Sequence, residues 1–187
     1  MQASFMRRCI ELAVKAQDKG AQPYGALIAD PVSGTVVAEG YNAASRNPLW
    51  HGEMAAIQNL SSTGVNVYEV APALELYTSA EPCAMCMSAI SWSGFGAVYY
   101  GTSIPFIESQ GAPQIDIRAV DVLASSSTLE HNTTVVGGVL NNETDPLYTA
   151  CGKRCQHGSH DHDLDDHGHD HDHGHGQHDH EYAIHEH

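Results

Sequence analysis

Basic residues are scarce in this chain. Its 187 residues include 8 lysines and arginines against 23 aspartates and glutamates, which gives a formal net charge of −15 at pH 7 with histidine neutral. A chain so poor in cations is badly suited to bind the phosphates of long nucleic acids. The chain also lacks the roughly 18 consecutive apolar residues of a membrane-spanning helix. Neither nucleic acid nor a membrane is therefore expected as a partner.

Cysteine is scarce as well, with five in the whole chain. This number fits a reducing compartment better than a disulfide-bonded scaffold. Residues 1–8 lack the basic start followed by an apolar run that marks a secretory signal. We therefore expect a cytoplasmic protein.

The charges that are present are unevenly distributed. Residues 1–156 hold 14 acidic and 8 basic residues, a charge of −6, whereas residues 157–187 hold 9 acidic residues, no lysine or arginine and 12 of the 14 histidines. The second segment has no apolar periodicity with which to bury a core, so we expect it to be a disordered His/Asp-rich tail. Residues 1–156 are long enough to form one domain with its own core.

Apolar residues at helical and alternating spacings predict strands joined by helices. The expected helices are residues 4–19 with Ser4 as their cap, two that begin at residue 51 and near residue 83, and residues 117–123 and 141–150. The expected strands are residues 24–29, 35–38, 74–78, 97–100 and 133–139. This order predicts a layered α/β fold with crossover connections. Residues 101–118 are expected to form a long loop, which is often functional, for instance as a lid.

Two short segments carry the residues that point to chemistry. His51, Cys83 and Cys86 are the ligand types that zinc prefers, and three protein ligands leave a fourth tetrahedral position open for water. Glu53, two residues after the histidine, is then a proton carrier beside that water and not a ligand. The two cysteines are three apart on an expected helix, whose N-terminus favours thiolates. The alternative is a structural zinc site closed by a further cysteine, Cys151 or Cys155.

The spacing of His51 and Glu53 places a demand on the local backbone. In a regular helix, residues two apart point about 200° away from one another. Both side chains can face one pocket only if His51 lies at the helix entrance with non-helical geometry. Asn47 and Pro48 upstream are compatible with such an irregular entrance.

Together, His-x-Glu and Pro-Cys-x-x-Cys resemble the signature of the zinc-dependent cytidine-deaminase-like superfamily, in particular its guanine deaminase and nucleobase deaminase branch. The resemblance covers about residues 5–150. It implies a three-layer α/β/α fold with a central mixed five-stranded sheet, with residues 1–156 as the zinc deaminase domain. It also implies one catalytic Zn²⁺ per chain, a small-molecule nucleobase substrate and a homodimer. In such an enzyme a metal-activated water displaces an exocyclic amine, with Glu53 as the proton shuttle.

The same resemblance assigns four residues to substrate binding: Asn42, Gly52, Trp92 and Tyr24. Trp92 resembles the aromatic residue of guanine deaminases, and Asn42 matches a loop asparagine that holds the base. Ordinary core packing of Trp92 and turn chemistry of Asn42 are the alternatives. Guanine, converted to xanthine and ammonia, is the preferred substrate. Because Gly52 also occurs in fungal-type cytosine deaminases, cytosine or a nucleoside is the alternative, followed by tRNA adenosine, which the acidic tail disfavours.

The tail leaves two interpretations open. It is either a solvated acidic segment or a reservoir that binds zinc, nickel or copper on its many imidazoles. Cys151, Cys155 and His157 form a possible secondary metal site where the domain meets the tail. A non-enzymatic alternative is a metal-buffering protein that uses this tail on an inactive deaminase scaffold.

Overall fold

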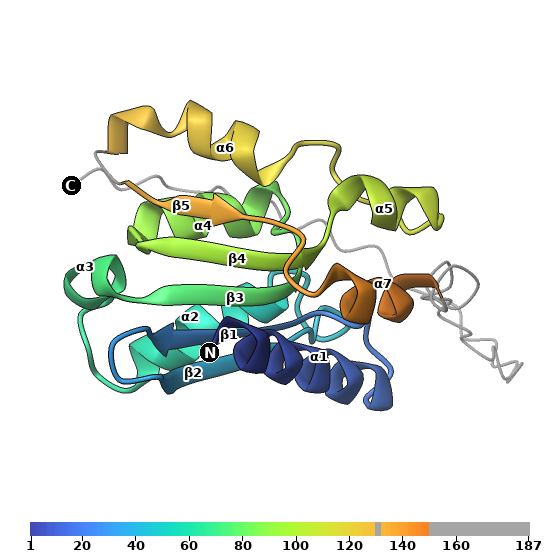
Figure 1. Cartoon of the computed structure of the whole chain (residues 1–187), viewed down its shortest axis with the longest axis horizontal. Coiled ribbons are helices and arrows are strands. Elements are labelled where there is room, and N and C mark those ends of the chain that lie inside the picture. The colour runs from blue at the N-terminus through green and yellow to red at the C-terminus, as the bar shows by residue number, and fades with distance from the viewer. Residues whose placement is uncertain (130–131, 150–187) are drawn as a thin grey trace, which may run out of the picture.

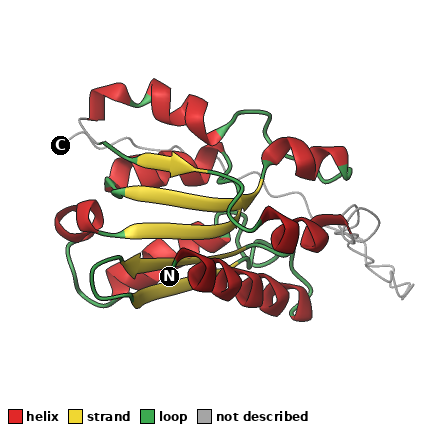
Figure 2. Ribbon diagram, viewed as in Figure 1, coloured by secondary structure: helices red, strands yellow, loops and turns green. Residues whose placement is uncertain are grey.

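The computed structural model describes residues 1–129 and 132–149. They form a sheet with strand order β2-β1-β3-β4-β5, flanked by helices (Figures 1 and 2). β1 runs antiparallel to both β2 and β3, whereas β3, β4 and β5 run parallel, so the expected mixed five-stranded sheet is confirmed. The strands are β1 (Gly25–Asp30), β2 (Thr35–Tyr41), β3 (Glu75–Ala80), β4 (Ala97–Thr102) and β5 (Thr134–Val136).

Helices cover both faces of the sheet, which gives the three expected layers. One face carries α1 (Gln2–Asp18) and α7 (Asn141–Thr149), as Figure 1 shows. The other face carries α2 (Gly52–Ser62), α4 (Ala84–Ser93) and α6 (Ala119–Ser125). Among the described residues, no helix is both long and apolar enough to cross a membrane.

Strand β1 is buried on both sides and separates two apolar cores. Leu27 and Ala29 pack with residues of α1, whereas Ala26 and Ile28 pack with residues of α2 and α4. Successive side chains of a strand point to opposite faces, so a strand covered on both sides must be apolar throughout. The run of apolar residues in β1 therefore fits its place inside the sheet, second from the β2 edge and covered by helices on both faces.

Two glycines allow the helices to approach the sheet closely. A Cβ on Gly40 of β2 would overlap the Gly52 carbonyl oxygen and the Ala56 amide nitrogen of α2. A Cβ on Gly25 of β1 would overlap the Cys9 carbonyl oxygen of α1. The backbone of α2, and with it the start of this helix, is therefore held directly against the sheet.

Several expected boundaries were wrong. Helix α1 begins two residues before Ser4, and the Ser4 hydroxyl donates to the Met1 carbonyl oxygen instead of capping the helix. The region 101–118 is only partly a loop, because α5 (Ile104–Ser109) occupies its first half with Ser103 as the N-cap. A further short helix, α3 (Val67–Val70), was not expected at all. The tail from residue 157, and the possible secondary site at Cys151, Cys155 and His157, lie outside the described residues.

Candidate active site

His51 lies at the entrance of helix α2, as its spacing from Glu53 requires. It is the N-cap residue, with φ −72° and ψ 163°, an extended conformation outside the helical region. The first helical turn then begins at Gly52, so the side chains of His51 and Glu53 are not bound to the 200° separation of a regular helix. The predicted irregular entrance is confirmed.

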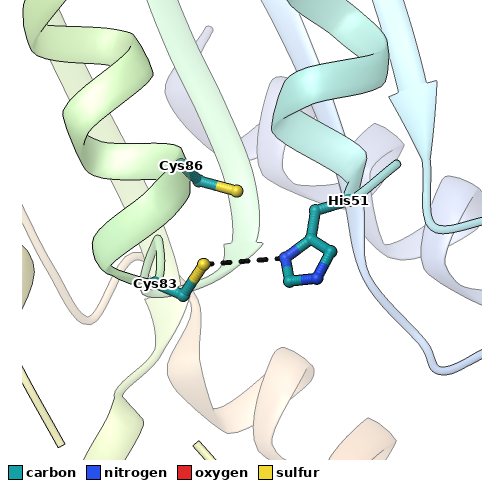
Figure 3. Close-up of side chains that lie close together, drawn as sticks. All are labelled: His51, Cys83 and Cys86. Carbon is teal, nitrogen blue, oxygen red and sulfur yellow. Dashed lines mark hydrogen bonds between the residues drawn. The ribbon is translucent and has the colours of Figure 1, made fainter. Parts of the chain in front are cut away.

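The two cysteines lie at the start of helix α4. Cys83 is the N-cap residue, with φ −65° and ψ 169°, and Cys86 lies in the first turn. Figure 3 shows the side chains of His51, Cys83 and Cys86 pointing toward one another from two different helices. Cys83 Sγ lies 3.6 Å from His51 Nδ1, and one ligand atom from each of the three residues lies within 4.8 Å of the others.

These distances fit a zinc ion. A tetrahedral site with a Zn–S distance of about 2.3 Å and a Zn–N distance of about 2.0–2.1 Å separates sulfur from nitrogen by about 3.6 Å. This value matches the separation of Cys83 Sγ and His51 Nδ1. The three residues therefore form a group that can hold a metal ion, and none of the other described residues joins it.

The protonation of the three groups also suits a cation. Hydrogen bonds from Cys86 and then from His51 lower the pKa of the Cys83 thiol to about 4, so that Cys83 is a thiolate at neutral pH. The hydrogen bond to this thiolate, followed by burial, raises the pKa of Cys86, and the same thiolate raises the pKa of His51. The thiolate is the liganding form, and a metal would displace the protons that these groups share.

Glu53 is buried beside this group, with 4% of its surface exposed. Burial, followed by the negative charge of Cys83, raises the pKa of its carboxyl group. The Thr78 hydroxyl donates to Glu53 Oε1 at 3.2 Å, which holds the carboxyl group in one orientation. A carboxyl group whose pKa is shifted toward neutrality can both accept and release a proton, as a general acid–base requires.

Three of the four expected substrate residues lie close to one another at the start of β1 and α2. The Asn42 amide donates to the Gln22 carbonyl oxygen at 3.2 Å, and its Oδ1 accepts from the Ala44 N–H at 3.1 Å. A Cβ on Gly52 would lie 3.2 Å from the Tyr24 carbonyl oxygen, which in turn accepts from the Asn42 N–H at 2.8 Å. Asn42 thus fixes its own loop, as turn chemistry requires.

Tyr24 and Trp92 have very different surroundings. The Tyr24 hydroxyl accepts from Gln114 Nε2 at 2.9 Å, and burial raises the pKa of Tyr24 to about 12, so its phenol is neutral. Trp92 is 61% exposed in the last turn of α4 and is not a core residue. Trp92 lies nine positions after Cys83 and six after Cys86, about 13 and 9 Å along the helix axis. Within one chain, Trp92 does not lie beside the cysteines.

The sequence did not indicate one buried carboxylate that positions this site. Glu81 precedes Pro82 and Cys83, and its side chain is fully buried. It accepts from Arg118 Nε at 2.8 and 2.9 Å, from the Ile104 N–H at 3.0 Å and from the Ala119 N–H at 3.0 Å. It therefore joins the turn before Cys83 to the starts of α5 and α6. An acidic residue directly before Pro82 and Cys83 was the available signal.

Residues 1–102 match the family model of the cytidine and deoxycytidylate deaminase zinc-binding region. The chain belongs to this deaminase family. The match includes His51, Glu53, Cys83 and Cys86, so the family's zinc-binding region and the group of facing ligands coincide. The protein is accordingly a zinc-type deaminase, a hydrolase acting on C–N bonds, with donors for one Zn²⁺.

Relatives of this deaminase have different substrates in their names. A probable cytosine deaminase of Schizosaccharomyces pombe is 30% identical over 145 residues, covering 75% of this chain and 85% of the relative. A guanine deaminase of Bacillus subtilis is 36% identical over 100 residues (52% and 62%), and a tRNA-specific adenosine deaminase of Rickettsia felis is 28% identical over 155 residues (80% and 99%). The structure of NE0047 in complex with 2,6-diaminopurine superposes with a TM-score of 0.69 at 25% identity, covering 81% of this chain and 82% of that one.

Proposed function

We propose that this deaminase removes the exocyclic amine of a free nucleobase, and that this base is guanine, which is hydrolysed to xanthine and ammonia. The observation that carries the proposal is the convergence of His51, Cys83 and Cys86 beside the buried carboxyl group of Glu53. In this proposal the first three residues are the zinc ligands. Glu53 is the catalytic residue.

Zinc, when bound, lowers the pKa of a water molecule toward 7 and so supplies a nucleophile at neutral pH. With zinc held by His51, Cys83 and Cys86, the carboxylate of Glu53 would take up a proton as the water oxygen bonds to the carbon that bears the amine. Glu53 would then release this proton to the amine nitrogen, so that the C–N bond breaks and ammonia leaves. Its burial and raised pKa suit both transfers. The hydrogen bond from Thr78 keeps Oε1 in place during the exchange.

The choice of a purine rests on two similarities together with the sequence features around Trp92. One relative is a guanine deaminase, and a similar structure holds 2,6-diaminopurine. Tyr24, Asn42, Gly52 and Trp92 are our proposed substrate residues. Tyr24 is the best supported of these by position, since the charges of Glu53 and Cys83 both contribute to its raised pKa.

Cytosine is the second candidate substrate, supported by the similarity to a probable cytosine deaminase and by Gly52 after the ligand histidine. A tRNA substrate is third, because the chain carries a net charge of −15 and phosphate binding needs cations.

The test is steady-state ammonia release from guanine, cytosine, adenine and their nucleosides, with the zinc-loaded protein. We expect turnover on guanine to exceed that on each other compound. Activity confined to cytosine would change the proposed substrate from guanine to cytosine, with the same deamination reaction. Activity only on a tRNA anticodon stem-loop would overturn the proposal of a free base.

We further propose a homodimeric, cytoplasmic enzyme whose deaminase domain is residues 1–156, with residues 157–187 as a separate tail. A chain that ends at residue 156 is expected to keep its turnover in zinc-replete buffer, and light scattering would give its subunit number. Loss of turnover with zinc still bound would contradict this division.

A further inference from the structure

A groove of about 710 Å³ follows the outer side of β2, away from the zinc ligands' side chains. Strand β2 is an edge of the sheet, and all six residues from Val36 to Tyr41 line the groove. Helix α1 contributes Lys15 to it, and the loop before α2 contributes Arg46 and Trp50. Six strand residues span about 20 Å, so the groove has the length to hold an extended chain segment.

Three cations gather at one end of this groove, around Tyr41. Lys15 Nζ and Lys19 Nζ lie 4.8 and 5.4 Å from the centre of the Tyr41 ring. Lys19, together with Lys15 and Arg46, lowers the pKa of the Tyr41 phenol, which places all three charges near its hydroxyl. The three cationic residues are exposed to solvent.

None of these three cations makes an ion pair within 4.0 Å in the described part of the chain, although the charge of Lys15 helps to lower the pKa of Glu39, after the hydrogen bond from Arg8. That part contains six lysines and arginines, and the other three, Arg7, Arg8 and Arg118, each make an ion pair with a glutamate. The glutamates nearest the groove, Glu11 and Glu39, are both bound by Arg8. Asp18 on α1 is the remaining nearby carboxylate. The four cations of this region, with Arg8 included, exceed the three carboxylates Glu11, Asp18 and Glu39 by one charge.

The chain itself contains a segment of complementary charge. Residues 157–187 carry nine acidic residues and no lysine or arginine. The last described helix, α7, ends near the segment that follows α1: the Tyr148 hydroxyl donates to the Pro23 carbonyl oxygen at 3.0 Å, and Pro23 lies four residues after Lys19. From Thr149 to Asp161 the chain can span about 40 Å, so the acidic residues can reach the groove.

We propose that the acidic tail, residues 157–187, docks in the β2 edge groove of its own chain against Lys15, Lys19 and Arg46. Tethering favours this occupant over a separate anion, because a covalent link raises the effective concentration of the tail at the groove. The docked tail lies against Trp50, the residue before the zinc ligand His51. This inference does not depend on which base the enzyme deaminates.

Carbodiimide crosslinking of the full-length, zinc-loaded protein tests the proposal. The reagent joins lysine amines to carboxylates in contact, and the chain has only three lysines, Lys15, Lys19 and Lys153. Lys153 is close to the tail in sequence and serves as the internal reference. Peptide mapping is expected to show Lys15 and Lys19 joined to tail carboxylates at least as often as Lys153. In about 1 M salt, where the Debye length is about 3 Å, the ratio of Lys15 and Lys19 links to Lys153 links should fall about five-fold or more.

A matched pair of variants isolates the groove charge. Arg46→Gln and Tyr68→Glu each make the net charge more negative by one, but Tyr68 lies on α3 at the other end of the sheet (Figure 1). Only Arg46→Gln should lower the ratio of Lys15 and Lys19 links to Lys153 links, by about two-fold or more. The proposal is overturned if tail links are confined to Lys153, or if both variants lower the ratio equally. Links between isotopically distinct chains in a mixture would also overturn it, since the occupant would then be a second copy.

Discussion

Replacing Glu81 by glutamine tests whether the buried carboxylate before Cys83 holds the site together. Its two oxygens accept from three groups: Arg118 Nε and the backbone N–H groups of Ile104 and Ala119. A glutamine has one oxygen and one NH₂ group, so at least one of these donors must face another donor. The variant keeps the size of the side chain, so the change is confined to hydrogen bonding and charge.

The magnitude follows from the burial of each partner. An unsatisfied buried N–H costs about 1–3 kcal/mol. The lost charge adds less, because Arg118 is 36% exposed and can turn to water. We expect Glu81→Gln to lower the free energy of unfolding by about 2–4 kcal/mol. The control is Glu143→Gln, which removes the same charge from a pair with Arg7 whose side chains are 58% and 34% exposed, and should leave the free energy of unfolding nearly unchanged.

Urea unfolding of both variants in saturating zinc measures this difference, with the midpoint and slope fitted together. Zinc content after gel filtration gives a second measurement, because Glu81 lies two residues before Cys83 and should affect zinc retention, whereas Glu143 should not. A Glu81→Gln protein no less stable than Glu143→Gln, with full zinc, would refute the role assigned to this carboxylate.

Three further changes have defined outcomes. Glu53→Gln should keep one zinc per chain by metal analysis but lower ammonia release by about 10²–10⁴-fold, and near-normal turnover would remove Glu53 from the proton transfer. Gly40→Ala should destabilise the fold by about 1–3 kcal/mol in thermal unfolding, because its methyl group meets the Gly52 carbonyl oxygen at the start of α2. Arg8→Gln should lower the free energy of unfolding more at neutral than at acidic pH, because hydrogen bonds from Arg8 lower the pKa of Glu39. A lowered folded-state pKa stabilises above the unfolded-state pKa, and this stabilisation is lost as the pH falls through the folded-state pKa. The difference between wild type and Arg8→Gln in urea midpoint should therefore shrink below about pH 4, and a constant difference would contradict this assignment.

The metal-binding part of the site could be predicted because its chemistry depends on residue type and short spacing. Only a few side chains bind zinc, and a Cys-x-x-Cys at a helix start brings both thiols to one side of the first turn. The extended backbone at His51 could be inferred from the same spacing, since a regular helix would have separated it from Glu53. The long-range pairing of these segments was supplied by the resemblance to a family and not by periodicity.

The contacts that position the site depended on tertiary structure. Glu81, Arg118 and the N–H of Ile104 are separated by up to 37 positions, and no local pattern relates them. The exposure of Trp92 on an otherwise apolar helix was also decided only by packing, since α4 is nearly continuous in small and apolar residues and has no clear polar face. By itself, the sequence predicted the ligand set and the proton carrier, and it predicted the mixed layers of strands and helices that the fold confirms. The fold decided which buried groups satisfy one another, because such pairing depends on distances between segments that local spacing does not encode.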